Sequence, residues 1–520
     1  MMSIYLSSVQ HIINTSVIAA AERLDILVQI DNIFAEIVAI LKAIFFYPIF
    51  GFPIIVLWLI LGGVYFTIRM GLINIRGFSH AVAVLTGQYQ NQNSSDEDDE
   101  QEGEVSPFQA ASTALSATVG LGSIAGSAIA IQMGGPGAIV WMIIAGFLGM
   151  STKFVESTLG QKYRQVKPDG SVAGGPMYYL ANGLGELGLG SLGTGLGFLF
   201  AILCIFGTFG AGNMFQANQS YAALAGVLPF IADRSWFFGI IMALLVGAVI
   251  LGGISRIGVV TSRLVPIVVL FYITGCLWII GTNWQLIPEA IGTILEGAFS
   301  PGAIEGGLVG VIVQGFRRAA FSNAAGIGSS AIAHSATKSD QPVQEGLIAA
   351  TEPVIDTMIV CNLTAISIVI TGVYKGFAVG EATGIQLTAA AFGTVVNWFP
   401  IVLAIAVILF AFSNIVSWSY YGEQAWMFIF GEDSVILYKL LFVIFVFLGS
   451  VIELGTVLDF SDIMLIAMSV PNLIGCFLLA GQVGDDLKVY MEKLRLERAM
   501  AKSSATETTE EAEEYTESKK

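Results

Sequence analysis

Two glycines and a serine interrupt an apolar stretch at Val119-Gly120-Leu121-Gly122-Ser123. Glycine weakens a helix by about 1 kcal/mol relative to alanine, so two glycines separated by one residue favour local unwinding. Unwound backbone at membrane depth exposes amide N–H groups to a carboxylate and carbonyl oxygens to a cation. Close helix packing is the first interpretation of this spacing, and a binding site made of backbone groups is the alternative that it leaves open.

A stripe of small residues runs through this motif with one member at every fourth position. Its members are Ala110, Ala114, Thr118, Gly122, Gly126, Ala130 and Gly134. On a helix they form a narrow face that lets neighbouring backbones approach closely in lipid. Helix packing explains most of these positions, so only the double-glycine segment remains a candidate for binding.

Polar side chains in other apolar stretches could complete such a site. One stretch carries three amide side chains, Asn213, Gln216 and Asn218, and another carries Ser413 and Asn414 followed by Trp418. Because an amide in hydrocarbon is costly unless paired, these groups either hydrogen-bond between helices or bind a small ligand. Ser413 and Asn414 could complete a cation site whose other ligands are backbone carbonyls.

The titratable residues indicate which ion such a site would take. Glu156 and Asp356 are expected near the cytoplasmic ends of their helices, where water can solvate them, so no deep lone carboxylate is expected. The three histidines are expected outside the apolar cores, and the four cysteines show no metal-ligand spacing. These features favour a metal cation over a proton.

The amino-acid composition indicates whether the folded chain is surrounded by water or by lipid. Of its 520 residues, 55% are hydrophobic and 12% are charged, with a mean hydropathy of +0.77. A soluble domain carries about 25% charged residues, so a soluble enzyme, a secreted scaffold and a nucleic-acid binder are excluded and a lipid bilayer is expected. The net charge of -16 comes largely from Asp96–Glu104 and Ser503–Lys520, which are predicted to be disordered and solvated.

Hydropathy predicts an all-α polytopic membrane protein with about 11 transmembrane helices. The spans are roughly 49–69, 108–131, 137–158, 195–223, 235–252, 259–281, 304–316, 350–373, 393–417, 434–452 and 461–482. The seventh is short, is interrupted by Gly306, Gly307, Gly310 and Gly315, and ends at Arg317-Arg318. Two interrupted helices, each followed by four spans, predict a five-plus-five inverted repeat of spans 2–11, with the first span outside it.

Basic residues predict the orientation and the domain limits. They concentrate after the first, third, fifth, seventh and last spans, with Arg317 and Arg318 counted among them and Lys42 on the opposite side. This asymmetry predicts a cytoplasmic C-terminus and an external N-terminus in the plasma (inner) membrane. The predicted parts are an external or interfacial segment 1–48, a transmembrane domain 49–482 with an acidic cytoplasmic loop 90–106, and a disordered cytoplasmic tail 483–520. Residues 4–21 lack the charged start of a cleaved signal, which favours an interfacial helix.

Sequence blocks in a fixed order over residues 50–482 resemble one known family. They are Gly134–Met142, Gly149–Glu156, Gly174–Tyr179, Gly212–Asn218, Phe321–Ser329, Asp356-Thr357, Phe410–Ser413 and Trp418–Glu423. Together they resemble the alanine or glycine:cation symporter family, the sodium:alanine symporters of the amino acid–polyamine–organocation superfamily. The resemblance implies sodium-coupled import of alanine, glycine or a similar small amino acid by a protein without an organic cofactor, and a monomer is expected.

The resemblance also implies roles for individual residues. The substrate carboxylate would be held by the backbone at Gly120, Leu121, Gly122 and Ser123. Gln216 would help hold the amino group, and Asn414 and Trp418 would shape the side-chain pocket. Sodium would be bound by the carbonyls of Ser116 and Val119 and by the side chains of Ser413 and Asn414.

Three departures from the family pattern bear on which amino acid the protein is expected to transport. The family usually has Gly-Thr-Gly-Asn where this chain has Gly120-Leu121-Gly122-Ser123, a threonine in place of Asn414, and a glutamate in place of Ala324. Retained glycines predict carboxylate binding with an altered side-chain preference. The alternative functions are a channel, or a cation- or proton-coupled carrier of another small solute; an intramembrane enzyme lacks a plausible catalytic cluster.

Overall fold

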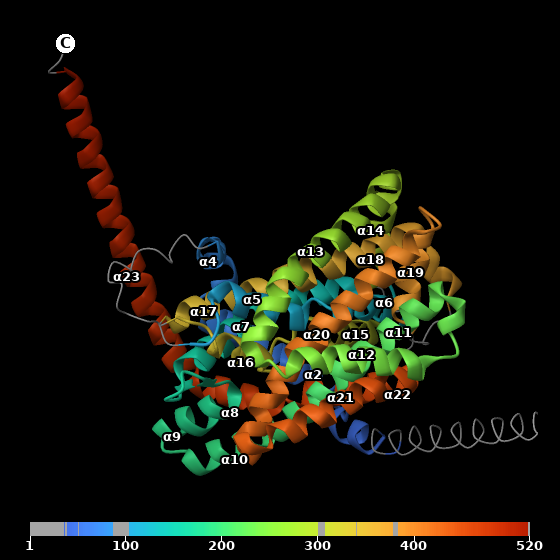
Figure 1. Cartoon of the computed structure of the whole chain (residues 1–520). Coiled ribbons are helices and arrows are strands. Elements are labelled where there is room, and N and C mark those ends of the chain that lie inside the picture. The colour runs from blue at the N-terminus through green and yellow to red at the C-terminus, as the bar shows by residue number, and fades with distance from the viewer. Residues whose placement is uncertain are drawn as a thin grey trace, which may run out of the picture.

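The computed structural model describes residues 36, 39–49, 51–86, 103–299, 307–339, 341–377 and 383–517 (Figure 1). The predicted interfacial helix at 4–21 and most of the acidic run before Gly103 lie outside the described residues. Within them the chain is helical apart from its connections and two short antiparallel strand pairs, β1 (Pro48–Ile49) with β2 (Phe52–Pro53) and β3 (Gln165–Val166) with β4 (Val172–Ala173). The predicted all-α class is confirmed.

The helices are named in the order in which they follow one another along the chain. They are α2 (Ile54–Arg69), α3 (Ile73–Arg76), α4 (Phe78–Leu85), α5 (Pro107–Thr118), α6 (Leu121–Gly134), α7 (Ala138–Lys162), α8 (Pro176–Tyr178), α9 (Leu184–Glu186), α10 (Gly190–Phe209), α11 (Phe215–Val227), α12 (Ser235–Ile250), α13 (Gly253–Thr282), α14 (Ile287–Phe299), α15 (Gly307–Asn323), α16 (Ser329–Ser335), α17 (Pro342–Pro353), α18 (Asn362–Thr371), α19 (Ile385–Gly393), α20 (Phe399–Phe430), α21 (Val435–Val451), α22 (Leu454–Ala467) and α23 (Ser469–Glu517). Three π-helical segments are η1 (Tyr179–Gly183), η2 (Gly210–Met214) and η5 (Val354–Cys361), and short 3₁₀ turns are η3 (Pro229–Ile231), η4 (Trp284–Leu286), η6 (Val373–Gly376) and η7 (Glu432–Ser434).

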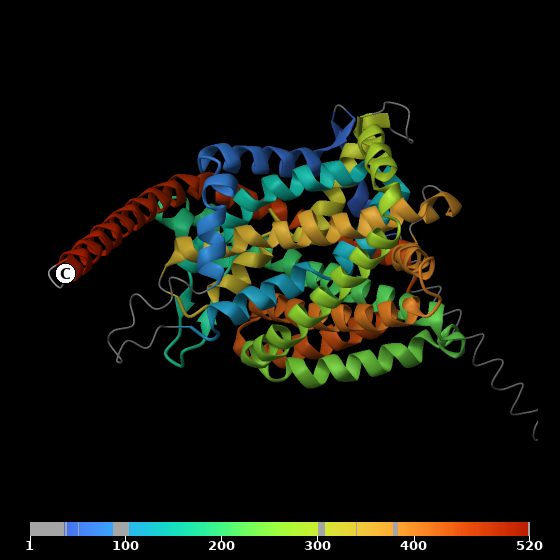
Figure 2. The same cartoon turned by 90° about the horizontal axis from the view of Figure 1, so that it is seen from above.

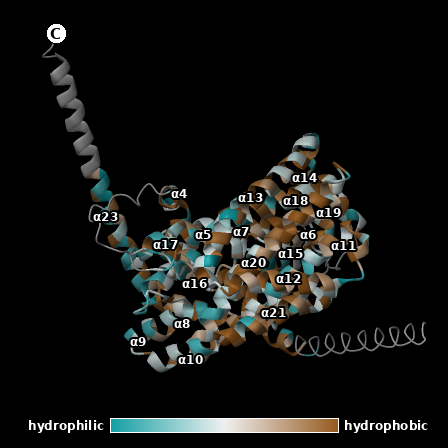
Figure 3. Ribbon diagram, in the orientation of Figure 1, coloured by the Kyte–Doolittle hydropathy of each residue, from teal (hydrophilic) through white to brown (hydrophobic). Residues whose placement is uncertain are grey.

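The bundle has the surface of a membrane protein. In the described part of the chain, 8 helical stretches are long and apolar enough to cross a bilayer, and α2 and α12 are shorter apolar helices. Apolar residues cover the outer faces of the bundle (Figure 3), with Leu244 of α12 69% exposed and Ile267 of α13 68% exposed. In Figure 2, α2 (blue) and α12 (green) lie at opposite edges of the bundle. The apolar window of α5–α6, in contrast, is 94% buried, so this helix pair lies in the interior.

The first interrupted helix breaks where the double glycine predicts. Helix α5 begins with a capping box between Ser106 and Gln109 and ends at Thr118. Val119 leaves the helical conformation at ψ 87, Gly120 is extended at φ -145 and ψ -150, and α6 starts at Leu121. The break therefore spans Val119 and Gly120.

The second interrupted helix breaks later than the sequence predicts. Helix α15 runs without interruption past Gly310 and Gly315 to Asn323, and the break follows at Ala324 (φ 55), Gly326 (φ 88) and Gly328 (φ 88), before α16. Gly315 serves packing: a Cβ atom there would lie 2.5 Å from Cβ of Trp141 in α7. A glycine required for close approach and one required for unwinding look alike in the sequence, which explains the wrong placement.

Arg317 and Arg318 do not end the seventh helix but are buried within α15. Both contact Asp462 of α22, and Arg317 also lies 3.3 Å from Asp459, which pairs with Lys42 at 3.0 Å. The two arginines therefore lie at the same end of the bundle as Lys42, and assigning them to the opposite side was wrong. Their partners lie more than 140 positions away, where no local pattern shows them.

The C-terminal segment is helical where disorder was predicted. Helix α23 continues from the bundle to Glu517, and Figure 1 shows it projecting away from the other helices. Its last part carries several glutamates and alanines, which are strong helix formers. Composition alone thus misled the prediction.

Candidate functional site

The two breaks face each other in the interior of the bundle. A Cβ atom on Gly122, in the first turn of α6, would lie 3.3 Å from the Phe321 carbonyl and 3.4 Å from the Ser322 Cα in the last turn of α15. Segment η5 of the eighth predicted span packs against both α6 and α15. Two interrupted helices and a π-helical segment of a third, continuous helix therefore converge here.

Helix α20 closes this region by binding the end of α5. The Asn414 Nδ2 atom donates to the carbonyls of Ser116 and Ala117, both at 2.9 Å, and the Trp418 indole Nε1 donates to the Ala117 carbonyl at 2.9 Å. The last carbonyls of a helix have no partner within the helix, so these side chains supply one. Asn414 and Trp418 are thereby placed at the break.

The predicted cation ligands lie around this junction. Ser116 Oγ and Asn414 Oδ1 are buried and have no hydrogen-bond partner among the described residues. Ser413 Oγ donates to the Phe410 carbonyl of its own helix at 3.0 Å, and Val119 is buried at the end of α5 with its N–H bound to Leu115. The Ser116 carbonyl already accepts from Asn414, but a carbonyl oxygen has two lone pairs and retains one for a cation. The junction is thus rich in buried oxygen atoms.

Gln216 hydrogen-bonds to the backbone on both sides of its amide group. Its Oε1 accepts the N–H of Leu121 at 3.2 Å, and its Nε2 donates to the Ala211 carbonyl at 3.0 Å. The Ser123 N–H donates to the Gly120 carbonyl at 3.1 Å. In this structure, therefore, Gln216 caps α6, and two of the four predicted carboxylate-binding amides already have acceptors. The amides of Gly120 and Gly122 remain the candidates.

The other two amides of the same stretch serve helix packing. Asn213 donates to the Phe442 carbonyl of α21 at 2.7 Å, and Asn218 donates to the Ile452 carbonyl at 2.8 Å. The π-helical segment η2, which contains Asn213, brings Gly212 against Trp418, since a Cβ on Gly212 would lie 2.3 Å from the indole Cγ. Of the three amides, only Gln216 reaches the break.

Asp356 lies deep in this region, contrary to the prediction of a solvated acid. Its carboxylate is fully buried in η5 and accepts hydrogen bonds from the hydroxyls of Ser123, Ser322 (2.5 Å) and Thr357 (2.9 Å). The signal in the sequence was an acid within a predicted span, but nothing local indicated that α6 and α15 would cover it. The sequence interpretation therefore missed a carboxylate beside the broken helices.

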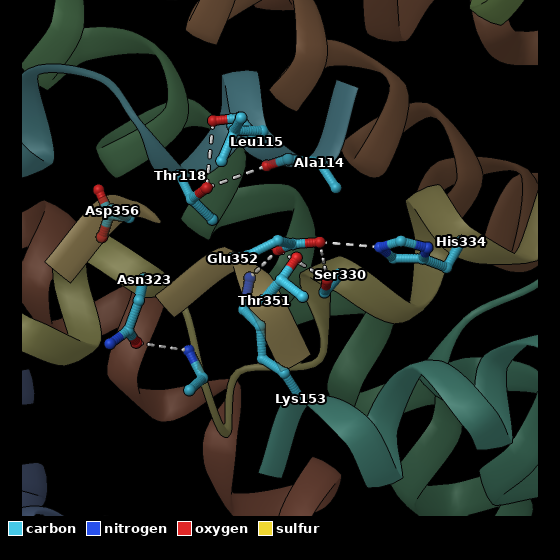
Figure 4. A network of polar contacts seen from close by, with 12 residues as sticks. Ala114, Leu115, Thr118, Lys153, Asn323, Ser330, His334, Thr351, Glu352 and Asp356 are labelled. Carbon is cyan, nitrogen blue, oxygen red and sulfur yellow. Dashed lines mark hydrogen bonds and ion pairs between the residues drawn. The ribbon is translucent and has the colours of Figure 1, made fainter. Parts of the chain in front are cut away.

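A separate charged cluster, the Lys153 cluster, joins α16, which follows the second break, to α7 and α17 (Figure 4). Lys153 of α7 binds Glu352 of α17, and His334 of α16 lies 2.8 Å from Glu352 and 2.9 Å from Glu345. All four side chains are buried, although His334 lies outside the helical stretches that are long and apolar enough to span a membrane. Because both imidazole nitrogens face carboxylate oxygens, the doubly protonated ring supplies a donor to each. The cluster pairs two bases with two acids.

Comparison with known proteins agrees with this architecture. The profile of the sodium:alanine symporter family matches residues 32–504. The sodium/alanine symporter AgcS of Methanococcus maripaludis is 40% identical over 84% of this chain and 93% of its own length. The probable sodium/glutamine symporter GlnT of Bacillus subtilis is 33% identical over 82% of this chain and 86% of its own length.

A solved structure shares the fold. The crystal structure of MhsT in complex with L-phenylalanine superposes with a TM-score of 0.51 at 14% identity, covering 75% of this chain and 99% of that chain. At this identity the likeness concerns the fold alone. The family match and the identity to curated relatives carry the assignment: the chain belongs to the sodium:alanine symporter family and is a membrane transporter, not an enzyme.

Proposed function

We propose that this protein imports alanine, glycine or a similar small amino acid together with sodium by alternating access. The observation that carries the proposal is the junction of α20 with the end of α5. There Ser116 Oγ and Asn414 Oδ1 are buried, without partners among the described residues, beside a helix break. Buried oxygens at an unwound helix end suit an alkali cation, which needs no fixed charge where enough oxygens converge.

In the proposed sodium site, Ser116 and Val119 contribute backbone oxygens and Ser413 and Asn414 contribute side-chain oxygens. Asn414 then has two roles, because its Nδ2 holds the end of α5 while its Oδ1 faces the ion. Sodium binding would fix α5 against α20. This links ion occupancy to the geometry of the break.

The substrate carboxylate is proposed to bind the amides of Gly120 and Gly122 at the N-terminus of α6. The helix dipole favours an anion at that end. In the loaded state, the Gln216 Oε1 atom would turn from the Leu121 N–H to the substrate ammonium. Trp418, lying on Gly212, would bound the pocket on the other side.

The preference for a small side chain rests on the aromatic residues beside the break. Phe321 lies against Gly122, and its ring packs edge-on against Phe215 with centroids 4.9 Å apart. These rings occupy the volume that a longer side chain would need. A glutamine-sized substrate therefore fits this chain less well than alanine or glycine.

Alternating access requires a body that moves and a source of energy. Helix α7 packs against α15, α16 and α17, and the Lys153 cluster joins α7, α16 and α17, so these elements are proposed to move as one unit.

The membrane potential supplies part of the energy. One elementary charge crossing 100 mV supplies about 2.3 kcal/mol, enough for a roughly fifty-fold concentration gradient of the amino acid before the sodium gradient is added.

Uptake into proteoliposomes tests the proposal. Labelled alanine and glycine should enter saturably when an inward sodium gradient is imposed, and replacement of sodium by potassium should abolish accumulation. Empty liposomes and vesicles with equal sodium on both sides are the controls. Flux that does not saturate and ignores sodium would indicate a channel and refute the proposal.

A further inference from the structure

Two arginines of α15 bind the same carboxylate oxygen of α22. The Arg317 Nη2 atom lies 2.6 Å from Asp462 Oδ2, and the Arg318 Nη2 atom binds that oxygen as well. The second carboxylate oxygen, Asp462 Oδ1, is buried and has no hydrogen-bond partner in the described part of the chain. The same is true of Arg318 Nε and Nη1. Two cationic donors and one anionic acceptor are therefore unused at this contact.

These unused groups indicate a ligand in addition to the ion pair. Arg318 is 1% exposed and Asp462 has no exposed surface, so bulk water does not solvate the unpaired atoms in this structure. Leaving buried charged groups partly unpaired costs free energy. An ion pair that only stabilised the fold would use both carboxylate oxygens, as the planar guanidinium readily does. The arrangement instead leaves donors and an acceptor for another molecule.

The pair lies next to the proposed central site. The guanidinium carbon of Arg318 lies 5.2 Å from the centre of the Phe321 ring, which is one turn further along α15. The same ring lies 3.3 Å from the position of a Cβ atom on Gly122, in the first turn of α6. Lys42 joins the arginines through Asp459, at the end of the bundle that the basic residues predict to be external. An amino acid that enters from this end would meet Arg318 before the break.

We propose that Arg318 and Asp462 form an outer subsite, which binds the incoming amino acid as a zwitterion before it reaches the break. The inference rests on the proposed import of a small amino acid and adds a binding step to it. The substrate carboxylate accepts from Arg318 Nε and Nη1, and the substrate ammonium group donates to Asp462 Oδ1. Because both residues are buried here, α15 and α22, which are in contact, must separate to admit the substrate.

This subsite differs from the central site in what it requires. Each charge of the zwitterion meets an opposite charge of the protein, so binding needs no sodium. The contacts involve only the carboxylate and ammonium groups, which all small neutral amino acids share. Transfer to the amides of Gly120 and Gly122 then requires movement of the Phe321 ring, which contacts both Arg318 and the first turn of α6.

Alanine binding to purified protein with the central site disabled tests the outer subsite. Gly120→Ala, which should abolish uptake, is the background, and saturation-transfer NMR in potassium chloride without sodium measures the dissociation constant. This protein should still bind alanine saturably. Adding Arg318→Lys, which keeps the charge but removes the paired N–H groups, should raise the dissociation constant about tenfold or more. Adding Asp459→Asn instead, which removes an acid one turn before Asp462 that pairs with Lys42, is the control and should leave it unchanged.

Two analogues of alanine test the same site without a substitution at Arg318. N-acetylalanine lacks the ammonium charge, and alaninamide lacks the carboxylate. Each should bind the Gly120→Ala protein at least about tenfold more weakly than alanine, because each leaves one charge of the subsite unmatched. N-acetylalanine that binds as tightly as alanine would indicate a site for anions alone and would overturn the proposal. Absence of saturable alanine binding to this protein would overturn it as well.

Transport kinetics separate the outer subsite from the proposed function. In the otherwise wild-type protein, Arg318→Lys should raise the KM for alanine about tenfold, while the maximal rate and the half-saturating sodium concentration stay within about twofold. An ion pair that only stabilised the fold would lower the amount of active protein, and a reduced maximal rate at an unchanged KM would overturn the subsite alone. If the wild-type protein shows no sodium-dependent uptake, the proposed function itself fails.

Discussion

The amide Nδ2 of Asn414 lies 2.9 Å from the backbone carbonyl oxygen of Ser116, joining two helices through residues that are 298 positions apart in the sequence. This bond fixes the unwound end of α5 to a long continuous helix, α20. The same asparagine keeps its Oδ1 atom buried and unpaired among the described residues. One side chain therefore holds the break in place and offers an oxygen beside it.

Asn414→Ala should weaken sodium binding and should also lower the stability of the fold. The substitution removes two hydrogen bonds to α5 and one proposed ligand, so the half-saturating sodium concentration for uptake should rise about tenfold. Asn213→Ala is the matched control, because it removes a buried asparagine that bonds only to the α21 carbonyl of Phe442 in the described structure. Both variants should lose some stability, about 1–2 kcal/mol, but a parallel rise in both half-saturation values would contradict the assigned role.

The effect of a glycine-to-alanine substitution on uptake should depend on its position in α5–α6. A Cβ at Gly120 would lie 2.6 Å from Asn414 Nδ2, whereas a Cβ at Gly126 would meet nothing within 4 Å. Gly120→Ala should therefore abolish uptake while the protein still inserts, and Gly126→Ala should retain it. Uptake per unit of reconstituted protein measures the difference, and equal activity in both variants would refute the importance of the close approach at Gly120.

Ala324→Gly should stabilise the protein. Ala324 has φ 55, a left-handed conformation that costs an L-residue about 1–2 kcal/mol and costs glycine little. The thermal unfolding midpoint in detergent should rise, corresponding to about 1 kcal/mol. Ala336→Gly, at φ -76, is the control and should lower the midpoint. A lower midpoint for Ala324→Gly would show that this residue is not strained in the folded protein.

Lys153→Met should destabilise the fold strongly because it leaves Glu352 buried without its lysine partner. Breaking a buried pair from one side typically costs about 3–5 kcal/mol. Lys162→Met removes a partly exposed pair with Asp486 and should cost about 1 kcal/mol or less. Comparing the two unfolding midpoints checks this prediction, and similar values would mean that the buried cluster does not stabilise the bundle.

The sequence predicts the first break correctly because its cause is local. Two glycines at Gly120 and Gly122 lower helix stability on their own, and the hydropathy of the surrounding stretch places them in a membrane. The second break depends on tertiary packing. Gly315 permits contact with Trp141, and the left-handed turn falls instead at Ala324–Gly328.

The charged residues show the other limit of prediction from sequence. Arg317 and Arg318 resemble a basic helix end, and Asp356 resembles a solvated acid, until their distant surroundings are known. Asp462 pairs with the arginines, while hydroxyls from α6 and α15 cover Asp356. The sequence predicts that a polar group lies within a span, but its depth and partner follow from the packing of other helices.

The backbone at Gly120 and Gly122 is proposed as the receptor for an amino acid carboxylate, and the other assigned roles depend on it. An experimental structure determined with alanine and sodium bound tests this most directly. We expect density for the carboxylate within hydrogen-bond distance of the Gly120 and Gly122 nitrogens, and an ion beside Ser413 and Asn414. Alanine bound away from an intact break, with those amides unoccupied, would contradict the proposal.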